Sequence, residues 1–503
     1  MRRSLIALSA FFLITNSKKG ARITMREYRL FIDGEFVESD SGEWIEVINP
    51  STEETISRVP EGSIQDVRRA ILSSHNAQKR WAKLSSAERG SYLKRIAEEI
   101  RREGEKLALT ISEEQGKPLS LSRIEVGATA EYFDFSAGWA RRYEGEIIPS
   151  DRKGENILLY KAPIGVISAI MPWNFPFFLI ARKVSPALIT GNTIIVKPSS
   201  ETPNSAFEFA EILQRVGLPQ GVINVVTGRG SVVGEELASN PKIGMVSLTG
   251  SVEAGISVMK SASKNITKVS LELGGKAPAI VMKDADLGLA VECIKRSRVI
   301  NAGQVCNCTE RVYVHEEIAE AFTQKMLSAM SSTTYGDPIE DPEVDMGPMI
   351  NLQALESVDS IVGRAVGEGA NLVLGGRRSS RFEKGFFYEP TVLTECRQKM
   401  EIVQKEIFGP VLPIVKFRTL EESIEMANDC EYGLTSSVYT KDLNTAFRFC
   451  NELKFGETYI NRENFEAIQG FHAGWRKSGI GGDDGKHGLE EFLKTHIVYI
   501  QYE

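Results

Sequence analysis

Cysteine and histidine are scarce in this sequence, which has six cysteines and five histidines among 503 residues. The cysteines show no framework spacing, which excludes a disulfide scaffold and favours a reducing compartment, so we expect a cytoplasmic protein. A structural zinc site usually takes about four ligands, and no histidine lies near Cys306 and Cys308, the two cysteines that are closest together. We therefore expect no metal site.

Blocks of one charge sign and long apolar stretches are also missing. The 60 basic and 67 acidic residues give a net charge of −7 without a basic block, so we expect no nucleic-acid partner. No apolar run reaches the roughly 20 residues of a membrane-spanning helix, so we expect no membrane association. The 42% apolar content is typical of a soluble chain, and the length predicts two or three domains.

The first 24 residues differ from the rest. Two arginines and a short apolar run resemble a signal peptide, but no cleavage site of small residues follows. Met25 then opens "MREYRLFIDGEFVESDSGEW", which is typical of a domain start. We interpret residues 1–24 as an upstream extension, with an export signal or anchor as the alternative.

Apolar runs alternate with helical stretches from residue 160 onward. Strands are expected at 165–172, 192–200, 221–228 and 242–250, with two more short ones within 268–282. Helices are expected at 178–190 and 204–214, from Ser231 and after Ser251. This alternation predicts a doubly wound α/β fold, in which a parallel sheet is covered on both faces and ligands lie beyond the carboxyl ends of the strands.

A second strand and helix series predicts a second α/β lobe. Its strands are expected at 310–315, 371–376, 409–417, 433–440 and 456–461, with a helix at about 316–330. The tail, residues 496–503, alternates like a strand and is expected to pair with residues 155–163, within the chain or across a subunit boundary. In the first series "TGRGSVVG" (227–234) is one residue out from the G-x-G-x-x-G pattern, so a phosphate contact at Gly230 and a turn without a ligand both stay open.

Four short motifs carry residues with catalytic chemistry. "MPWNFPF" (171–177) and "VKPSSE" (196–201) place Asn174 and Lys197 at strand ends, "LELGGK" (271–276) places Glu272 before two glycines, and "GQVCNC" (303–308) holds Cys306. Because three of these motifs end strands of one predicted sheet, their side chains are expected to converge on one cleft. The set fits the oxidation of an aldehyde through a thioester.

Each residue type suits one step of that reaction. A thiolate at Cys306 adds to the aldehyde carbonyl. The side-chain amide of Asn174 and the backbone N–H of Cys306 stabilise the oxyanion, and one such donor is worth about 3 kcal/mol of barrier. After hydride transfer to a nicotinamide, Glu272 activates the water that releases the acid. We expect the glycines beside Glu272 to let cofactor and water approach closely.

Together with "EIFGPV" (406–411), these motifs resemble the aldehyde dehydrogenase superfamily over residues 25–503. The resemblance implies that Cys306 is the nucleophile, Glu272 the general base and Asn174 the oxyanion donor. It implies that Lys197 and Glu406 contact the two cofactor riboses, and that Phe408 packs near the nicotinamide ribose unless it is a core residue. The other cofactor contacts it implies are Pro172, Trp173, Ser199, Ser200, Gly230, Gly250, Ser251 and Leu273.

The resemblance also implies a domain plan. Residues 25–138 and 160–272 are expected to form the dinucleotide-binding domain, and residues 273–465 the catalytic domain. Residues 139–159 and 483–503 are expected to form a small β oligomerisation hairpin, and a homodimer or homotetramer follows. Cys308 is expected to be a structural thiol, with a reversible disulfide or sulfenamide role as the alternative.

Within the superfamily, "WNFPFFLIARK" (173–183) and "NRENFEAIQGFHAGWRKSGIGG" (461–482) are most similar to the lactaldehyde and glycolaldehyde dehydrogenase branch. Many members line the substrate tunnel with apolar groups, whereas this sequence offers polar candidates, which suit lactaldehyde, glycolaldehyde or glyceraldehyde. These candidates are Arg182, Asn307, Glu466 and His472.

Two alternatives stay open for the substrate and the activity. Succinate semialdehyde is the rival substrate, with Arg182 binding its far carboxylate, although Arg182 is also a candidate for a salt bridge within the fold. A non-catalytic structural member of the superfamily is the alternative of another class, against which the intact Cys306, Glu272 and Asn174 argue. The presence of Glu272 favours release of a free acid over acyl transfer to coenzyme A.

The cofactor motif departs from the family pattern. Many NAD-preferring members have Lys-x-x-Glu here, whereas the third residue after Lys197 is Ser200, and the glutamate follows at Glu201. Adjacent side chains of an extended segment face opposite ways, so Glu201 is not expected to replace the missing carboxylate unless the chain shifts locally. We therefore expect NADP to be accepted at least as well as NAD, with NADP favoured.

Overall fold

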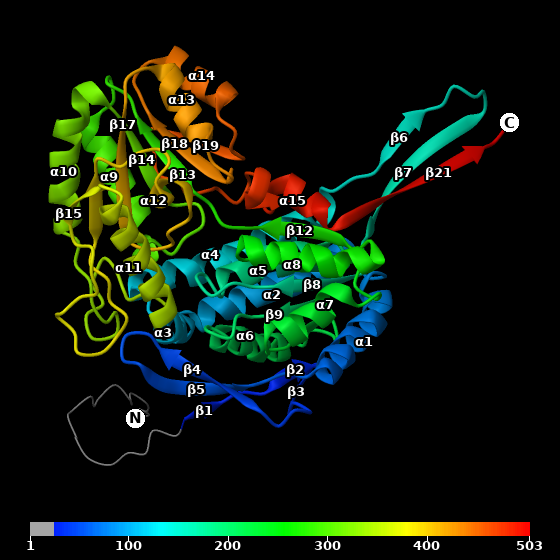
Figure 1. Cartoon of the computed structure of the whole chain (residues 1–503). Helices are drawn as coiled ribbons and strands as arrows, with labels where there is room; N and C mark the ends of the chain where they lie inside the picture. Colours follow the sequence, from blue (N-terminus) through cyan, green and yellow to red (C-terminus); the bar gives the residue numbers. More distant parts are fainter. Residues whose placement is uncertain (1–24) are drawn as a thin grey trace, which may run out of the picture.

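An eight-stranded sheet organises the first lobe of the molecule (Figure 1). The structure is a computed structural model that describes residues 25–503, so the interpretation of residues 1–24 lies outside the described part. The five central strands are parallel, in the order β12-β11-β8-β9-β10. They are β8 (Val166–Ile170), β9 (Thr193–Lys197), β10 (Ile223–Val225), β11 (Met245–Thr249) and β12 (Lys268–Glu272). The predicted doubly wound sheet is thus confirmed.

Antiparallel strands close both edges of this sheet, and a small sheet adjoins it. The edge strands are β20 (Gly479–Ile480) on one side and β2 (Leu30–Ile32) with β3 (Glu35–Val37) on the other. The small sheet has the order β1-β5-β4 and consists of β1 (Arg26–Glu27), β5 (Glu54–Pro60) and β4 (Trp44–Asn49). The sequence analysis expected this domain to consist of residues 25–138 and 160–272. Because β20 comes from residues 479–480, the sheet contains a third segment of the chain.

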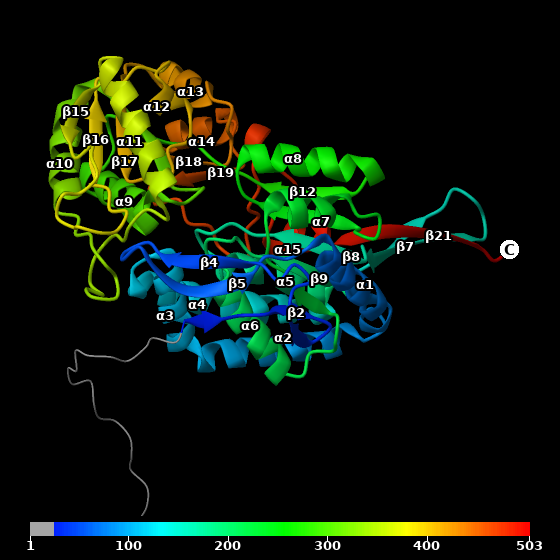
Figure 2. The ribbon, with the colours of Figure 1, turned by 60° about the horizontal axis from the view of Figure 1, so that its bottom comes forward.

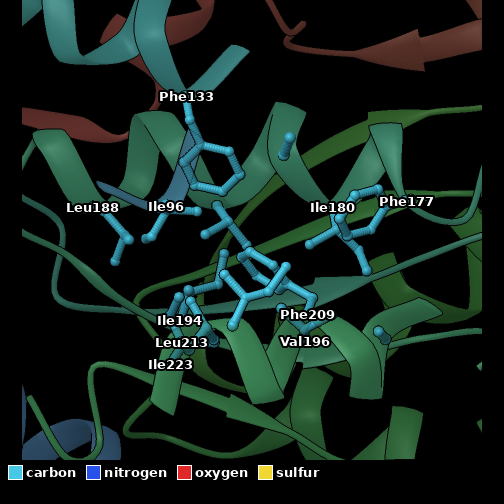
Figure 3. Packing of buried hydrophobic residues seen from close by; sticks show 14 of the residues in the cluster. Ile96, Phe133, Phe177, Ile180, Leu188, Ile194, Val196, Phe209, Leu213 and Ile223 are labelled. Atoms are coloured by element: carbon cyan, nitrogen blue, oxygen red, sulfur yellow. The ribbon is translucent and has the colours of Figure 1, made fainter. Parts of the chain in front are cut away.

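Alternate residues of each strand point to opposite sides of the eight-stranded sheet. Because these residues are apolar on both sides, helices cover both faces. Ile194 and Val196 of β9 belong to one hydrophobic cluster, together with Phe133 and Phe209 from helices, and Figure 3 shows this packing. Ile195, between them, belongs to the cluster on the other face. The first face is covered by α2 (Ser86–Arg102), α4 (Leu119–Gly138), α5 (Phe178–Ile189) and α6 (Asn204–Arg215), and the second by α7 (Glu235–Ser239) and α8 (Val252–Ala262). Helices α1 (Ile64–Trp81) and α3 (Gly104–Gln115) complete the lobe.

The order of the strands determines where the ligand crevice lies. The chain passes from β8 to β9 and β10 on one side, and then returns to β11 and β12 on the other side of β8. This reversal is a topological switch point, beyond which open α/β sheets bind their ligands. The crevice therefore lies where "MPWNFPF" follows β8 and Gly250 follows β11.

The predicted second α/β lobe is present and is built on a seven-stranded sheet. Its order is β15-β16-β17-β14-β13-β18-β19, parallel except for β15. Its strands are β13 (Ala277–Val281), β14 (Thr309–His315), β15 (Asn371–Leu374), β16 (Thr391–Thr394), β17 (Val411–Phe417), β18 (Thr435–Tyr439) and β19 (Glu457–Ile460). Its helices are α9 (Leu287–Val299), α10 (Ala319–Ser331), α11 (Leu352–Gly367), α12 (Glu401–Gln404), α13 (Leu420–Asn428) and α14 (Leu443–Glu452).

A three-stranded β arm projects from the first lobe, as Figures 1 and 2 show. The tail strand β21 (Leu493–Gln501), which follows α15 (Gly485–Glu491), runs antiparallel to β7 (Glu155–Pro163), and β6 (Glu146–Pro149) pairs with the other edge of β7. The predicted pairing of the tail is confirmed and lies within the chain. Because β7 continues to Pro163, the arm extends past residue 159, where the sequence had placed its end.

None of the described helices combines the length and the apolar character that a membrane span requires.

Candidate active site

A cavity of about 170 Å³ lies at the crevice, where side chains from both lobes meet. The strand ends of the first lobe contribute one wall, and the loops of Cys306 and Glu406 contribute the other. The residues that line it are Pro172, Trp173, Asn174, Thr249, Gly250, Ser251, Glu272, Leu273, Gly274, Cys306, Glu406 and Phe408. The structure thus brings the predicted catalytic trio and most predicted cofactor contacts together.

Hydrogen bonds fix Asn174 against the loop of Cys306. The Nδ2 of Asn174 donates to the carbonyl oxygen of Gln304 at 3.0 Å, two residues before Cys306. Its Oδ1 accepts the backbone N–H of Phe175 at 3.1 Å. The amide group is therefore oriented with its donor nitrogen towards the cysteine loop, as an oxyanion donor requires.

A buried ion pair that the sequence analysis missed supports this loop. The Nζ of Lys117 donates to the carbonyl oxygen of Asn174 at 2.6 Å and lies 2.5 Å from the carboxylate of Glu125. The other oxygen of Glu125 accepts the backbone N–H groups of Phe177 and Phe178 at 2.9 and 3.0 Å. Breaking such a pair leaves an uncompensated buried charge, which typically costs about 3–5 kcal/mol. No motif marks either residue.

The two glycines after Glu272 allow a close approach of the second lobe, which the sequence did not predict. A Cβ atom at Gly274 would lie 2.3 Å from a carboxylate oxygen of Glu406, and one at Gly275 would lie 2.4 Å from the carbonyl oxygen of Cys306. The N–H of Gly275 donates to Oε1 of Glu406 at 2.7 Å. The glycines therefore admit two segments of the second lobe, and Gly274 also lines the cavity.

Glu272 is buried without a hydrogen-bond partner. Within residues 25–503 neither carboxylate oxygen has one. Burial raises the pKa of Glu272 to about 8, although the nearby His472 opposes the rise. An unpaired carboxyl group with a pKa near neutrality suits proton transfer to and from water.

His472 is buried beside Glu272. Its Nε2 is 3.7 Å from Oε2 of Glu272. Its Nδ1 lies 2.5 Å from Oε1 of Glu457, a residue that the sequence analysis did not identify. The sequence had placed His472 only at the substrate entrance.

Arg182 forms the salt bridges that the sequence had kept as the alternative to a role in substrate binding. Its Nη2 contacts the carboxylate of Glu466 and lies 2.8 Å from Oδ2 of Asp484. Burial of Glu466 favours its neutral form, but the adjacent Arg182 outweighs this effect and lowers the pKa of Glu466 to about 2. The Oε2 of Glu466 accepts a hydrogen bond from Nδ2 of Asn307 at 2.6 Å. Arg182 thus acts on the site through Glu466 and Asn307.

Cys308 points into a buried network instead of the cavity. Its Sγ lies 3.1 Å from Nη2 of Arg298, and burial raises the pKa of its thiol to about 12. Arg298 pairs with Glu310 at 2.9 Å, and Glu310 accepts the backbone N–H groups that follow Glu406. The network ties the loop of Cys306 to the loop of Glu406, which fits the structural thiol that the sequence predicted.

The loop of Glu406 presents an aromatic side chain to the cavity. Phe408 has a positive φ of 55°, and its ring meets that of Trp173 edge-on at 5.5 Å between centroids. Phe408 is half-buried and lines the cavity, so it is not a core residue.

The segment after Lys197 bends, whereas the sequence argument took it as extended. Strand β9 ends at Lys197, and the Oγ of Ser199 accepts the N–H of Glu201 at 3.3 Å, which closes a turn. The side chain of Glu201 accepts from Nδ2 of Asn351 at 3.2 Å. Through this hydrogen bond Glu201 contacts the second lobe. Burial lowers the pKa of Lys197, at the end of β9, to about 8.

The phosphate-binding elements expected from the sequence lie at helix starts. Ser251 caps α8, its Oγ accepting the N–H of Ala254 at 3.2 Å, and it lines the cavity. Gly230 opens a short π-helix (Gly230–Gly234) before α7, and a Cβ atom there would meet nothing within 4 Å. Packing within the chain therefore does not require glycine at position 230.

A model of the aldehyde dehydrogenase family matches residues 36–498 of this sequence. The chain belongs to the aldehyde dehydrogenase family. It is therefore an oxidoreductase, and it is 58% identical over 475 residues to lactaldehyde dehydrogenase of Escherichia coli (strain K12), covering 94% of this chain and 99% of that relative. It is 39% identical over 477 residues to the D-glyceraldehyde dehydrogenase (NADP(+)) of Thermoplasma acidophilum, covering 94% and 96% of the two chains.

Solved structures agree with this assignment. A structure of lactaldehyde dehydrogenase superimposes on this aldehyde dehydrogenase with a TM-score of 0.94 at 57% identity, covering 95% of this chain and 100% of the other. A structure of 3,6-anhydro-L-galactose dehydrogenase in complex with NAP superimposes with a TM-score of 0.92 at 41% identity, covering 94% and 100%.

Proposed function

We propose that this aldehyde dehydrogenase oxidises small 2-hydroxyaldehydes, such as lactaldehyde, glycolaldehyde or glyceraldehyde, to free acids with NAD or NADP. Cys306 attacks the carbonyl carbon, and the amide of Asn174 donates to the oxygen that becomes negative. Glu272 takes a proton from the water that hydrolyses the thioester. When bound, the nicotinamide cofactor accepts the hydride that the hemithioacetal releases.

The residues of the cavity fit such a cofactor. Ser251 and Gly250 stand at the amino end of α8, where backbone N–H groups favour a diphosphate. The carboxylate of Glu406 and the ring of Phe408 lie on the opposite wall, beside the glycines after Glu272. Lys197 stands at the end of β9, where the adenosine ribose is expected.

The buried amide of Asn307 is the observation that carries the substrate proposal. Glu466 engages its Nδ2, while its Oδ1 has no partner in the part of the chain that the structure describes. A buried acceptor without a donor costs about 1–3 kcal/mol, which a substrate hydroxyl removes by donating to it. Succinate semialdehyde is not favoured, because the carboxylates of Glu466 and Asp484 already neutralise Arg182.

We expect Asn307→Leu to discriminate between hydroxylated and plain aldehydes. Leucine keeps the branched shape of asparagine, is larger, and lacks both the acceptor and the Nδ2 donor to Glu466. We therefore expect kcat/KM for glycolaldehyde and lactaldehyde to fall about tenfold more than kcat/KM for propanal. Steady-state kinetics with the three aldehydes measure the ratio. Equal losses for all three would contradict the proposed role of Asn307 and indicate a change in the nucleophile loop instead.

We also propose that NADP is accepted at least as well as NAD, because Ser200 stands where a carboxylate would repel a 2′-phosphate. Two unit charges about 4 Å apart near a protein surface interact by roughly 4 kcal/mol before screening. We expect Ser200→Glu to shift the ratio of kcat/KM values towards NAD by about tenfold or more. Kinetics with both cofactors at saturating aldehyde test this.

Glu201→Gln is the matched control, since Glu201 hydrogen-bonds Asn351. It should leave the cofactor ratio unchanged. A wild-type preference for NAD above about tenfold, or a large effect of Glu201→Gln alone, would mean that Glu201 reaches the ribose.

The β arm supports a proposed homodimer or homotetramer. Five of its apolar side chains are exposed, which is unfavourable in water and is relieved by a second copy of the chain; they are Ile147, Tyr160, Ile497, Tyr499 and Ile500. We propose that the eight-stranded sheet forms the dinucleotide-binding domain, the seven-stranded sheet the catalytic domain and the arm the oligomerisation element. The free state of all six cysteines fits the proposed cytoplasmic location.

A further inference from the structure

Lys117 and Glu125 lie behind the proposed oxyanion site, and the reaction proposed above gives them no role. Both side chains are fully buried, and neither lines the cavity. Lys117 lies in the turn between α3 and α4, where Gly116 ends α3 at a φ of 81° and Pro118 precedes α4. The fixed φ of proline and the helices on either side leave the backbone of Lys117 little freedom.

The ammonium group of Lys117 has three hydrogens and three partners. Its Nζ lies 2.5 Å from Oε2 of Glu125, donates to the carbonyl oxygen of Asn174 at 2.6 Å and lies 3.7 Å from the centroid of the Phe175 ring. The carboxylate alone is enough to neutralise the charge. The other two contacts both fall on the segment that carries the proposed oxyanion amide, so they select one position of that segment.

The carbonyl oxygen of Asn174 joins Lys117 to the nucleophile loop. This oxygen accepts a second hydrogen bond from Nδ2 of Asn301 at 3.1 Å, so both of its lone pairs are used. In return, Nδ2 of Asn174 donates to the carbonyl oxygen of Gln304 at 3.0 Å. The main chain and the side chain of Asn174 are thus bonded to two points of the segment that leads to Cys306.

The segment before Cys306 depends on such contacts, because its backbone is strained. Residues 301–303 have positive φ angles of 48°, 55° and 74°. Left-handed conformations of residues with a side chain persist only where the surroundings hold them. The hydrogen bond from Asn301 to the carbonyl oxygen of Asn174 is one such restraint, and Lys117 holds the same oxygen from the other side.

One hydrogen of the Asn174 amide remains for the substrate. Nδ2 carries two hydrogens, and within residues 25–503 it makes one hydrogen bond, to Gln304. Oδ1 accepts the N–H of Phe175, so the amide cannot exchange its two ends without losing that bond. Asn174 lines the cavity, and an oxyanion donor stabilises the transition state only when it is aimed at the atom where negative charge forms.

We propose that Lys117 is a positioning residue that acts through Asn174. The ammonium group holds the carbonyl oxygen of Asn174 against the nucleophile loop and thereby aims the side-chain amide at the oxyanion that forms when Cys306 attacks. Glu125 holds the ammonium group in place, and its other oxygen accepts two backbone N–H groups at the start of α5. The inference rests on the proposed role of Asn174 and adds the group that sets its orientation.

In the competing arrangement the ion pair only holds α3, α4 and the start of α5 together. The pair then contributes to stability, and the orientation of the Asn174 amide does not depend on it. The two arrangements differ in whether a change at Lys117 still affects the reaction after the amide of Asn174 has been removed.

The test is a double-mutant cycle on kcat/KM for propanal, measured from the reduction of the cofactor. Lys117→Met/Glu125→Gln removes both charges together, and glutamine still accepts N–H groups at the start of α5. In the wild-type background we expect kcat/KM to fall by about thirtyfold or more, because a misplacement of about 1 Å costs about a hundredfold. In the Asn174→Ala background the same two changes should lower kcat/KM by less than about threefold.

Each other outcome of the cycle overturns the proposal. An equal loss in both backgrounds would mean that Lys117 acts independently of Asn174. An unchanged kcat/KM in the wild-type background would mean that the ion pair is structural only. If Asn174→Ala alone has no effect, the proposed role of Asn174 fails as well, which separates that failure from a failure of Lys117. Because propanal has no hydroxyl group, the result does not depend on the proposed preference for 2-hydroxyaldehydes.

Ser112→Ala/Ser122→Ala is the matched control. The two buried hydroxyls lie 2.8 Å apart and join α3 to α4, but they do not line the cavity. The control should have the kcat/KM of its parent in both backgrounds. A loss as large as that of Lys117→Met/Glu125→Gln would overturn the proposal, since loosening α3 and α4 would then be enough.

Glu125→Gln alone guards against a double variant that does not fold. In this variant the amino group of Lys117 still reaches the carbonyl oxygen of Asn174. We therefore expect kcat/KM to stay within about threefold of the wild type, while the midpoint of thermal unfolding falls because the buried cation has lost its partner. A larger loss of kcat/KM would overturn the proposal, because the hydrogen bond that aims the amide is still present.

Discussion

Replacing Cys306 by alanine should abolish aldehyde oxidation, lowering kcat/KM by about four orders of magnitude or more. Cys306 is half-buried and lines the cavity, where the amide of Asn174 is oriented towards its loop. Without the sulfur neither the hemithioacetal nor the thioester forms, so hydride transfer has no donor. The rate of cofactor reduction with glycolaldehyde measures the loss, and an unchanged thermal unfolding midpoint shows that the fold persists.

Cys308→Ser is the control for this experiment. A serine hydroxyl can also accept from Arg298 and donate to the carbonyl oxygen of Val305, as the Cys308 thiol does at 3.1 and 2.9 Å. Most of the activity should therefore remain. Comparable losses in the two variants would contradict the assignment of Cys306 as the only nucleophile and indicate that the two thiols act as a pair.

Glu272→Gln should stall the release of the acid far more than its formation. Glutamine has the shape of the side chain but accepts no proton, so the steady-state rate should fall by about a hundredfold or more. The thioester then accumulates, and rapid mixing should show a burst of reduced cofactor close to one equivalent per site. An unchanged steady-state rate would mean that another group activates the water.

The pH dependence gives a second readout of Glu272. Burial raises its pKa to about 8, and the carboxylate that accepts a proton from water is the form present above that value. Where acid release limits turnover, the wild-type rate should increase as the pH approaches about 8 and then level off, and the variant should lose this rise.

Glu114→Gln is the matched control for both readouts. Glu114 is also buried, with a pKa raised by burial to about 8, but it binds the backbone N–H groups at the start of α6 and lies outside the cavity. Its replacement should produce no burst. A burst in both variants would indicate a general effect of removing a buried carboxyl group.

The local pattern of the sequence was sufficient for the architecture. Apolar runs such as those of β9 and β11 alternate with amphipathic stretches, and a buried parallel strand needs such a run because both of its faces are covered. The same pattern places Asn174, Lys197 and Glu272 at or just beyond strand ends, where the parallel sheet gathers them. Even the pairing of β21 with β7 followed from the alternation in the tail.

Such local patterns do not identify contacts between side chains that are far apart in the sequence. Arg182 meets Glu466 across 284 positions and Asp484 across 302, and only the packed fold shows that its charge is already neutralised. The turn after Lys197 depends on the hydroxyl of Ser199, which competes with an extended backbone. Such contacts depend on which surfaces are buried together.

The sequence by itself thus determined the fold class and the family, and it predicted Cys306, Glu272 and Asn174 as the candidate catalytic residues, because local periodicity and short motifs encode them. The tertiary structure alone decided that Gly274 and Gly275 admit the segments of Glu406 and Cys306, and that His472 pairs with Glu457 beside Glu272. The reason is physical: hydrogen bonds and charges act over a few ångströms in space, and only folding brings these groups within that range.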